Sequence, residues 1–335
     1  MVTDQQQPFS NGKFVISLDF ELLWGVRDKK TIESYGANIL GVQQTIPAML
    51  SLFDKYNTRV TFSTVGFLFA KNREELIANK PAVLPEYADP KLSPYPDFAI
   101  LGNDEKDDPY HFGYSLFQQI AANKNHEVGT HTFCHYYCLE PGQTIDAFRH
   151  DLLAARKIGL AHNIEVRSLV FPRNQFNEEY LLCCKEAGID SYRGNPLSWL
   201  YSARNKNDES LTRRAFRFID TYINLTGYHC HTRQHVTGSV ITNIAASRFL
   251  RPWSKRLSFL EGLRLNRIKR AMLHAAKKKK LFHLWWHPHN FGANLEQNIA
   301  FLEKILKYYD QLNKRYGFES ITMTGLADQL KSSHE

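Results

Sequence analysis

The sequence predicts an α/β barrel, and three observations lead to that prediction. Short apolar runs that suit buried strands alternate with stretches of helical periodicity, seven or eight times along the chain. Acidic residues and histidines follow several of these runs, where a barrel builds its active site. The 335 residues are 43% hydrophobic and 23% charged, an ordinary globular balance that excludes disordered and fibrous proteins. An open, doubly wound sheet is the alternative arrangement of the same elements.

The individual elements follow in chain order. An apolar run at 13–18, ending before Asp19, is typical of a buried strand. Residues 39–56 show the helical spacing that covers one face of a sheet, and a second strand is predicted at 59–65. Further strands are predicted at 127–130, 167–171, 189–193, 238–242, 281–286 and 320–323, and further helices near 114–123, 144–162, 177–187 and 293–315.

Two segments interrupt this alternation within a single predicted domain over residues 13–330. Residues 80–110 contain six prolines and an acidic patch, so we expect an irregular surface insertion of about 75–112 that could cover a site. Residues 244–280 are predicted to form one or two basic helices. Residues 248–280 hold twelve Lys or Arg and one Asp or Glu, a net +11, while the whole chain carries +8.

This local charge suggests a partner. An interfacial helix of this kind would be attracted to anionic lipid headgroups or to a carrier diphosphate. A solvated basic helix packed on the barrel is the plainer alternative. We expect no nucleic-acid partner, because no recognised binding motif accompanies the charge.

Other features indicate the setting of the protein. Five cysteines form an odd set in a chain without a secretory signal, which favours reduced thiols over disulfides. The sequence has no apolar run of 18 residues and no leader-like N-terminus. We therefore expect a cytoplasmic protein, placed at the inner face of the membrane if the basic segment binds lipid.

Three groups of residues could carry chemistry. Asp19 and Glu21 follow the first strand, although acids there can also cap a helix. His131 and His135, four residues apart, could face one metal ion, with an oxygen ligand from elsewhere completing the set. The third group follows the apolar run at 281–286 and could supply a general acid, and it includes His283, His287 and His289. His126, His283 and His289 are alternative ligands, and Cys134 and Cys138 are soft ones.

The order of these motifs resembles the polysaccharide deacetylase family, the carbohydrate esterases with a NodB-type homology domain. The resemblance covers most of residues 13–330, and its most specific part is the central histidine motif. It is carried by Asp-x-Glu at 19–21, His-Glu-x-Gly-x-His-Thr-x-x-His at 126–135, Phe-Pro-Arg at 171–173 and Trp-His-Pro-His at 286–289.

The resemblance implies a distorted (β/α) barrel of about seven strands and a divalent metal, most commonly zinc. The family's usual motif has two adjacent aspartates, whereas here Phe20 separates an aspartate from a glutamate. By similarity, Asp19 is the base and Glu21 a metal ligand, with the reverse assignment open. His131 and His135 are the other ligands, His287 or His289 is the general acid, and Arg173 orients the catalytic carboxylate.

The activity that the resemblance implies is metal-dependent hydrolysis of an N-acetyl group on an amino sugar. We expect the substrate to be an intracellular or lipid-linked glycan precursor of surface polysaccharide biosynthesis. Residues that could contact it are Tyr110, His111, Arg193, Trp199 and His289. The alternatives are a deformylase, an allantoinase-like C–N hydrolase, and a catalytically silent glycan- or membrane-binding module.

Overall fold

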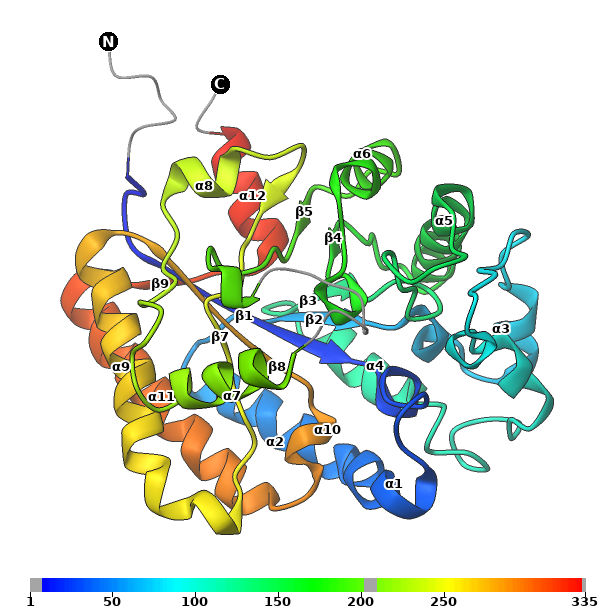
Figure 1. The fold of residues 1–335 in the computed structure, drawn as a ribbon, viewed down its shortest axis with the longest axis horizontal. Helices are drawn as coiled ribbons and strands as arrows, with labels where there is room; N and C mark the ends of the chain where they lie inside the picture. Colours follow the sequence, from blue (N-terminus) through cyan, green and yellow to red (C-terminus); the bar gives the residue numbers. More distant parts are fainter. Residues whose placement is uncertain (1–7, 202–209, 333–335) are drawn as a thin grey trace.

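The structure is a computed structural model that describes residues 8–201 and 210–332. Its strands form one parallel sheet in the order β6-β5-β4-β3-β2-β1-β8-β7, with β9 beside β1 (Figure 1). The strands are β1 (Lys13–Phe20), β2 (Thr61–Thr64), β3 (Glu127–Thr130), β4 (Ser168–Leu169), β5 (Ser191–Tyr192), β6 (Thr242–Asn243), β7 (Arg248–Phe249), β8 (Leu281–Trp286) and β9 (Glu319–Ser320).

Helices surround this sheet in the alternation that the sequence predicts. They are α1 (Ile32–Leu40), α2 (Val42–Lys55), α3 (Arg73–Ala78), α4 (Tyr114–Ala122), α5 (Ile145–Ala161), α6 (Glu178–Glu186), α7 (Leu211–Asp220), α8 (Arg233–Thr237), α9 (Glu261–Lys278), α10 (His289–Gly292), α11 (Leu295–Tyr316) and α12 (Met323–Ser332). Between α3 and α4 the proline-rich segment forms only short 3-10 turns, at Pro90–Leu92 and Tyr95–Ala99. None of the described helices is long and apolar enough to cross a membrane.

One short segment joins the two ends of the sheet. β6 and β7 stand at opposite ends of the strand order, yet only residues 244–247 separate them. The Ile244 N–H donates to the Tyr192 carbonyl at 2.8 Å, on the β5 side. Three residues later, the Ser247 N–H donates to the His283 carbonyl of β8 at 2.8 Å. The sheet therefore curls into the predicted distorted barrel rather than an open doubly wound sheet.

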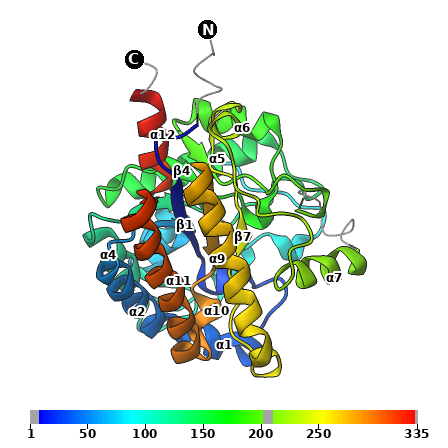
Figure 2. The same cartoon turned by 90° about the vertical axis from the view of Figure 1, so that its left-hand side faces the viewer.

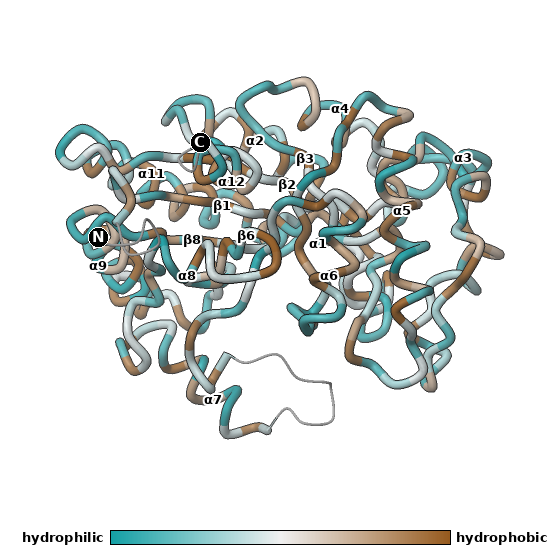
Figure 3. Tube along the Cα trace, turned by 90° about the horizontal axis from the view of Figure 1, so that it is seen from above, coloured by the Kyte–Doolittle hydropathy of each residue, from teal (hydrophilic) through white to brown (hydrophobic). Residues whose placement is uncertain are grey.

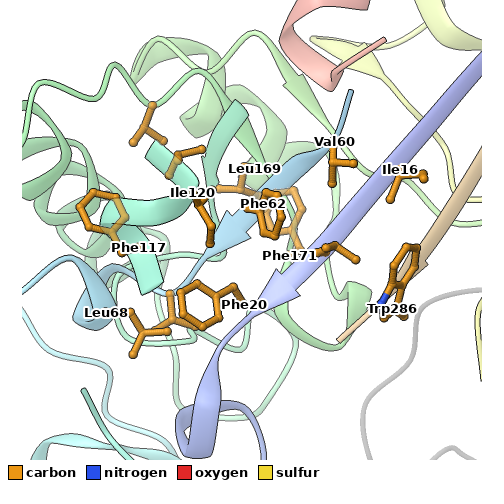
Figure 4. Close-up of a cluster of buried hydrophobic side chains, with 14 of the residues drawn as sticks. Ile16, Phe20, Val60, Phe62, Leu68, Phe117, Ile120, Leu169, Phe171 and Trp286 are labelled. Carbon is orange, nitrogen blue, oxygen red and sulfur yellow. The ribbon is translucent and has the colours of Figure 1, made fainter. Parts of the chain in front are cut away.

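The alternation of side chains along β1 separates the outer core from the barrel interior. Phe14, Ile16, Leu18 and Phe20 belong to the large cluster packed between the sheet and the helices, and all are at most 1% exposed. Val15 belongs to a second cluster inside the barrel. Figure 4 shows Phe62 of β2 and Leu169 of β4 next to Ile120 and Phe117 of α4. The same alternation turns Ser17 and Asp19 inward.

The basic segment differs from its prediction at its start. Residues 248–249 form β7 instead of a helix, because the Ser247 and Leu250 N–H groups donate to β8 carbonyls. The long helix α9 follows, and it lies beside α11 on one side of the barrel (Figure 2). Its apolar side, including Ile268 and Met272, is buried there.

The predictions for residues 320–323 and 39–56 also need correction. Only Glu319–Ser320 pair with β1, and Met323 begins α12, so burial rather than strand pairing explains the apolar alternation. The helical stretch is two helices divided at Gly41, where an added Cβ would lie 2.3 Å from the Gly292 carbonyl oxygen. This close approach brings α1 and α2 against α10. Figure 3 shows hydrophobic stretches along β1 and β8 in the interior of the molecule.

Candidate metal centre

A carboxylate and two histidines meet at the carboxyl ends of β1 and β3. Glu21 directly follows β1, and His131 and His135 follow β3. The Oε2 atom of Glu21 lies 3.3 Å from Nε2 of His131 and 3.2 Å from Nε2 of His135. The three ligand atoms lie within 4.8 Å of one another, and all three residues are buried. One carboxylate and two imidazoles match the ligand set of catalytic zinc sites, which keep a position open for water or substrate.

The chain after β3 turns sharply so that both histidines point to one place. Thr132 and His135 have φ values of 63° and 61°, in the left-handed region. The buried Asp151 of α5 holds this turn, because its carboxylate accepts the N–H groups of Phe133 at 2.8 Å and Cys134 at 3.0 Å. Burial raises the pKa of Asp151 to about 6. The two histidines, four residues apart, therefore face the same point because the chain turns between them and not because it is helical.

The arrangement of lone pairs indicates a cation between these side chains. Nδ1 of His131 lies 2.8 Å from the Val170 carbonyl, which can only accept, so this nitrogen carries the proton. In the neutral ring, Nε2 then presents a lone pair to Glu21 Oε2, which is also an acceptor. That oxygen is buried and has no hydrogen-bond partner among the described residues. Two facing acceptors in a buried site repel each other unless a cation lies between them, so the residues fit a divalent metal.

The charge states of the ligands agree with this fit. Burial alone would raise the pKa of Glu21, but His287, His131 and His135 hold it well below its ordinary value. Burial lowers the pKa of His135 to about 4, against the opposing effect of Glu21. At neutral pH the carboxylate is therefore ionised and the His135 ring is neutral, which are the forms that bind a metal.

A glycine leaves the space in which Glu21 takes this orientation. A Cβ added at Gly25 would lie only 1.9 Å from the Cδ atom of Glu21. Any side chain at Gly25 would displace the carboxylate from the two histidines. No motif in the sequence marks this glycine.

Asp19 lies beside the three ligands and is held by an arginine. Arg193 donates from Nη1 to Oδ1 of Asp19 at 2.7 Å and from Nη2 to Oδ2 at 2.8 Å. The same guanidinium donates to Ser17 and Asn174, and it stacks 4.0 Å from the ring centre of Trp285. Burial raises the pKa of Asp19, but Arg193 and His131 outweigh it, so the net shift is downward. Asp19 is thus an oriented, ionised carboxylate.

This pairing corrects the predicted role of Arg173. That arginine donates to Glu140 at 2.7 Å and to Asp28 at 2.6 Å, and its guanidinium lies 3.9 Å from the ring centre of Tyr137. Arg193, predicted only as a substrate-contacting residue, is the arginine that orients Asp19. Arg173 follows β4 with a φ of 54°, and it lines the pocket around Glu21, His131 and His135 while its hydrogen bonds go to Glu140 and Asp28.

Two histidines after β8 face the same space. Nε2 of His287 lies 3.6 Å from Oδ2 of Asp19 and 3.7 Å from Oε1 of Glu21. Nε2 of His289 lies 3.8 Å from Glu21 Oε1, and the two imidazole rings stack with centres 5.1 Å apart. His289 is 3% exposed, and burial lowers its pKa to about 4, whereas the His287 side chain is 23% exposed. His287 is therefore the better placed of the two to meet a substrate.

The other candidate ligands lie elsewhere. His283 is buried between the Ile244 carbonyl and the Ser17 hydroxyl, at 2.7 and 2.9 Å, and burial lowers its pKa to about 3. His126 packs against the rings of Phe53 and Phe62. All five cysteines are free thiols, and none belongs to the metal-ligand group.

The predicted substrate-contacting residues are dispersed. The pocket around the ligand triad is lined by Arg193 and His289, together with Val26, Lys29, Lys30, Tyr35, Arg173, Asn174, Phe249, Trp285 and Asn290. Tyr110, His111 and Trp199 are not among its lining residues. His111 instead packs on Trp24 and lies 2.9 Å from Asp108, and Trp199 is 66% exposed.

Comparisons with known proteins agree with the fold. A protein from Mycobacterium smegmatis, assigned as a polysaccharide deacetylase, matches with a TM-score of 0.54 at 12% identity, over 98% of this chain and 93% of that one. A protein from Pseudomonas aeruginosa PAO1 with the same assignment gives 0.53 at 10% identity, over 96% and 90%. Puue allantoinase gives 0.51 at 11% identity, over 96% and 90%.

The sequence itself matches no protein-family model, and no curated protein matches it either. At 10–12% identity the structural matches concern the fold alone. The chain therefore has the distorted barrel fold of the polysaccharide deacetylase structures, with a Glu-His-His group at the carboxyl ends of its strands.

Proposed function

We propose that this protein is a metal-dependent hydrolase that removes the N-acetyl group from an amino sugar. The observation that carries the proposal is the meeting of Glu21, His131 and His135 with Asp19 and His287 in one pocket. Three side chains can hold a divalent ion there, and two others remain free to move protons. Zinc suits the nitrogen and oxygen ligands best.

The residues then divide the work of amide hydrolysis. When bound, the metal would polarise the amide carbonyl and lower the pKa of water at the site. Asp19 accepts a proton from the attacking water, while Arg193 fixes the orientation of its carboxylate. His287 donates a proton from Nε2 to the departing nitrogen, because an unprotonated amine is a poor leaving group. The products are acetate and the free amino sugar.

Metal content and product release test this proposal together. Protein purified without a metal-affinity tag should hold about one zinc ion per chain, and the His131→Ala/His135→Ala variant should hold none. Wild type should release acetate from N-acetylglucosamine oligosaccharides or N-acetylglucosamine 1-phosphate. Asp19→Asn is the matched control, because it should keep the metal and lose the activity.

Three results would contradict the proposal. Wild type that binds no zinc even when zinc is supplied would exclude the metal centre and favour a silent binding module. Release of formate from N-formyl sugars, without release of acetate, would indicate a deformylase. Full activity in Asp19→Asn would exclude the proposed base.

The proposed substrate is a glycan precursor of surface polysaccharide biosynthesis, carried on a lipid at an anionic membrane face. The support is the charge of residues 248–280, together with exposed apolar side chains in the same stretch. Phe259 is 78% exposed and Leu263 50% exposed, and Lys255 is exposed beside them. Co-sedimentation should be stronger with anionic than with neutral liposomes, and Phe259→Ser should weaken it. Equal binding to both liposomes would exclude this partner.

A further inference from the structure

A second pocket adjoins the metal centre and has a distinct chemical character. Its cavity has a volume of about 310 Å³, within the range of small-molecule sites. The two pockets share Arg173, Asn174, Phe249, Trp285 and His287 as a common wall. A ligand in the second pocket could therefore extend past Trp285 and His287 to the metal ligands.

Arginines line this pocket without any acidic residue. The lining includes Arg173, Arg217, Arg248 and Arg251, and it holds no aspartate or glutamate among the described residues. The nearby Asp220 is fully buried behind the lining and is shared by Arg248 and Arg267, at 3.5 and 3.4 Å. Asp220 thus serves two guanidinium groups, whereas Arg173 is already paired with Asp28 and Glu140, so the positive charge offered to a ligand comes from Arg248 and Arg251.

Two of these arginines have capacity to bind a ligand. Arg248 is 6% exposed; its Nη2 atom forms the ion pair with Asp220, and its Nε atom is buried without a hydrogen-bond partner among the described residues. Arg251 donates from Nε to the Thr221 hydroxyl at 3.1 Å, which leaves its terminal nitrogens without any acceptor that the described residues supply. A buried guanidinium donor without a partner carries a desolvation cost, which an anion would remove.

The charge and the shape of the groups define the class of anion. Several guanidinium groups around one cavity favour a ligand with more than one negative charge, and their planar forks match phosphoryl oxygens. The aromatic faces of Phe249 and Trp285 at the shared wall suit the apolar face of a sugar ring. We propose that the pocket around Arg248 and Arg251 binds a phosphoryl group of the substrate, so that the substrate is a phosphorylated N-acetylamino sugar. That this pocket belongs to the substrate site rests on the proposed function.

A matched pair of ligands isolates the contribution of the phosphoryl group. Calorimetry would compare N-acetylglucosamine with N-acetylglucosamine 1-phosphate on the full chain carrying Asp19→Asn, which should keep the metal without hydrolysing either ligand, and the variants below carry the same substitution. The phosphate should tighten binding by about tenfold or more. Arg251→Gln should remove most of that gain, because it deletes one guanidinium from the wall. Arg256→Gln is the matched control, since Arg256 is exposed, lies in the same segment and does not line the pocket.

A second variant guards against failure of Arg251→Gln to fold. Asn195 lines the same pocket, and Asn195→Asp adds a carboxylate without changing its size. This variant should also weaken binding of the 1-phosphate, but not of the unphosphorylated sugar. Equal effects of Arg251→Gln and Arg256→Gln, or no gain from the phosphate, would overturn the proposal.

The outcome is separable from that of the proposed function, because binding is measured without turnover. Acetate release from neutral oligosaccharides with no preference for the 1-phosphate would refute the phosphoryl pocket alone. A phosphate preference without hydrolysis would refute the deacetylase alone. Two further ligands identify the source of the phosphoryl group. Tighter binding of a nucleoside diphosphate sugar supports a soluble substrate, and tighter binding of a prenyl phosphate sugar in detergent supports a lipid-linked one.

Discussion

The ion pair between Arg193 and Asp19 is the arrangement whose removal should have the largest measurable effect. Both side chains are almost fully buried, at 1% and 3% exposure, and two hydrogen bonds of 2.7 and 2.8 Å join them. Arg193→Gln removes the guanidinium and leaves the Asp19 carboxylate buried. His131 and His287 remain near that carboxylate and offset part of the loss.

The size of the effect follows from the two hydrogen bonds. A hydrogen bond to a charged group contributes about 1.5–3 kcal/mol, so two of them give about 3–6 kcal/mol. Removing one partner of a buried ion pair costs about 3–5 kcal/mol in mutational studies, which agrees with that range. Arg193→Gln also loses its bonds to Ser17 and Asn174 and its stacking on Trp285. A double-mutant cycle with Asp19→Asn cancels these other losses, and the coupling energy should be about 3 kcal/mol.

The pH dependence of stability independently tests the direction of the Asp19 pKa shift. In the wild type the pKa of Asp19 is lowered, so its contribution to stability is present above the ordinary carboxyl pKa and is lost as pH falls through the lowered value. In Arg193→Gln, burial should raise the pKa of Asp19. As pH falls, protonation of this carboxylate then removes the buried unpaired charge and reduces the variant's loss of stability. The difference between the two proteins should therefore be greatest near pH 7 and shrink below about pH 4.

Urea unfolding of the four proteins in the cycle, at pH 7 and pH 4, measures both quantities. The proteins should be freed of metal, so that differences in metal binding do not enter the free energy of unfolding. A coupling energy below about 1 kcal/mol at pH 7 would match an exposed ion pair, and it would refute the role assigned to burial. A coupling that does not change with pH would refute the electrostatic origin.

Three further predictions concern the residues around the metal ligands. Gly25→Ala should weaken zinc affinity about 10–100-fold while keeping the circular dichroism spectrum, because the new Cβ displaces Glu21; zinc titration with unchanged affinity would contradict this. Burial raises the pKa of Asp151 to about 6, so the folded protein prefers the protonated form of this residue. The free energy of unfolding of the wild type should therefore fall by about 3 kcal/mol as pH rises from 4 through 6. Urea unfolding should show that Asp151→Asn loses this pH dependence, and an unchanged slope would exclude Asp151 as its source. His287→Ala should lower kcat for acetate release about 10²–10⁴-fold and leave zinc content unchanged, and loss of zinc would make His287 a ligand instead.

The fold was predictable from sequence because its strongest signals are local. The run 281–286 and the residues 127–130 are strands at those bounds, since each is a short segment buried in a parallel sheet. The predictions failed where apolar alternation had another cause. At 320–323 the buried side chains cover the end of the barrel. At 248–249 two residues of a basic stretch pair with the edge of β8.

The meeting of Glu21, His131 and His135 was predictable for a different reason. Glu21, His131 and His135 stand directly after strands, and the carboxyl ends of neighbouring parallel strands meet at one end of a barrel. The residues that hold them were not predictable. Gly25 and Asp151 act through a close approach and through two backbone N–H groups, and neither contact leaves a pattern in the sequence.

The choice between Arg173 and Arg193 shows the limit of a motif. Both arginines follow strands, at β4 and β5, and both reach the mouth of the barrel. Their partners are decided by side-chain direction. Arg193 continues β5 inward to Asp19, whereas the left-handed backbone at Arg173 turns its side chain to Asp28 and Glu140. A sequence pattern carries the position of such residues, but not the direction in which they point.

The basic segment shows the same limit for charge, with a consequence for function. A net +11 over residues 248–280 suggests a solvated helix, yet Arg248, Arg264 and Arg267 are at most 6% exposed. Because residues 244–247 cross from β5 to β8, the start of this segment forms a wall of the barrel mouth instead of its outer surface. Its first cations therefore line the pocket that adjoins the Glu-His-His group, where a positive charge can act on a substrate. The location of charge in the fold, rather than its sum along the sequence, is what connects this segment to the proposed reaction.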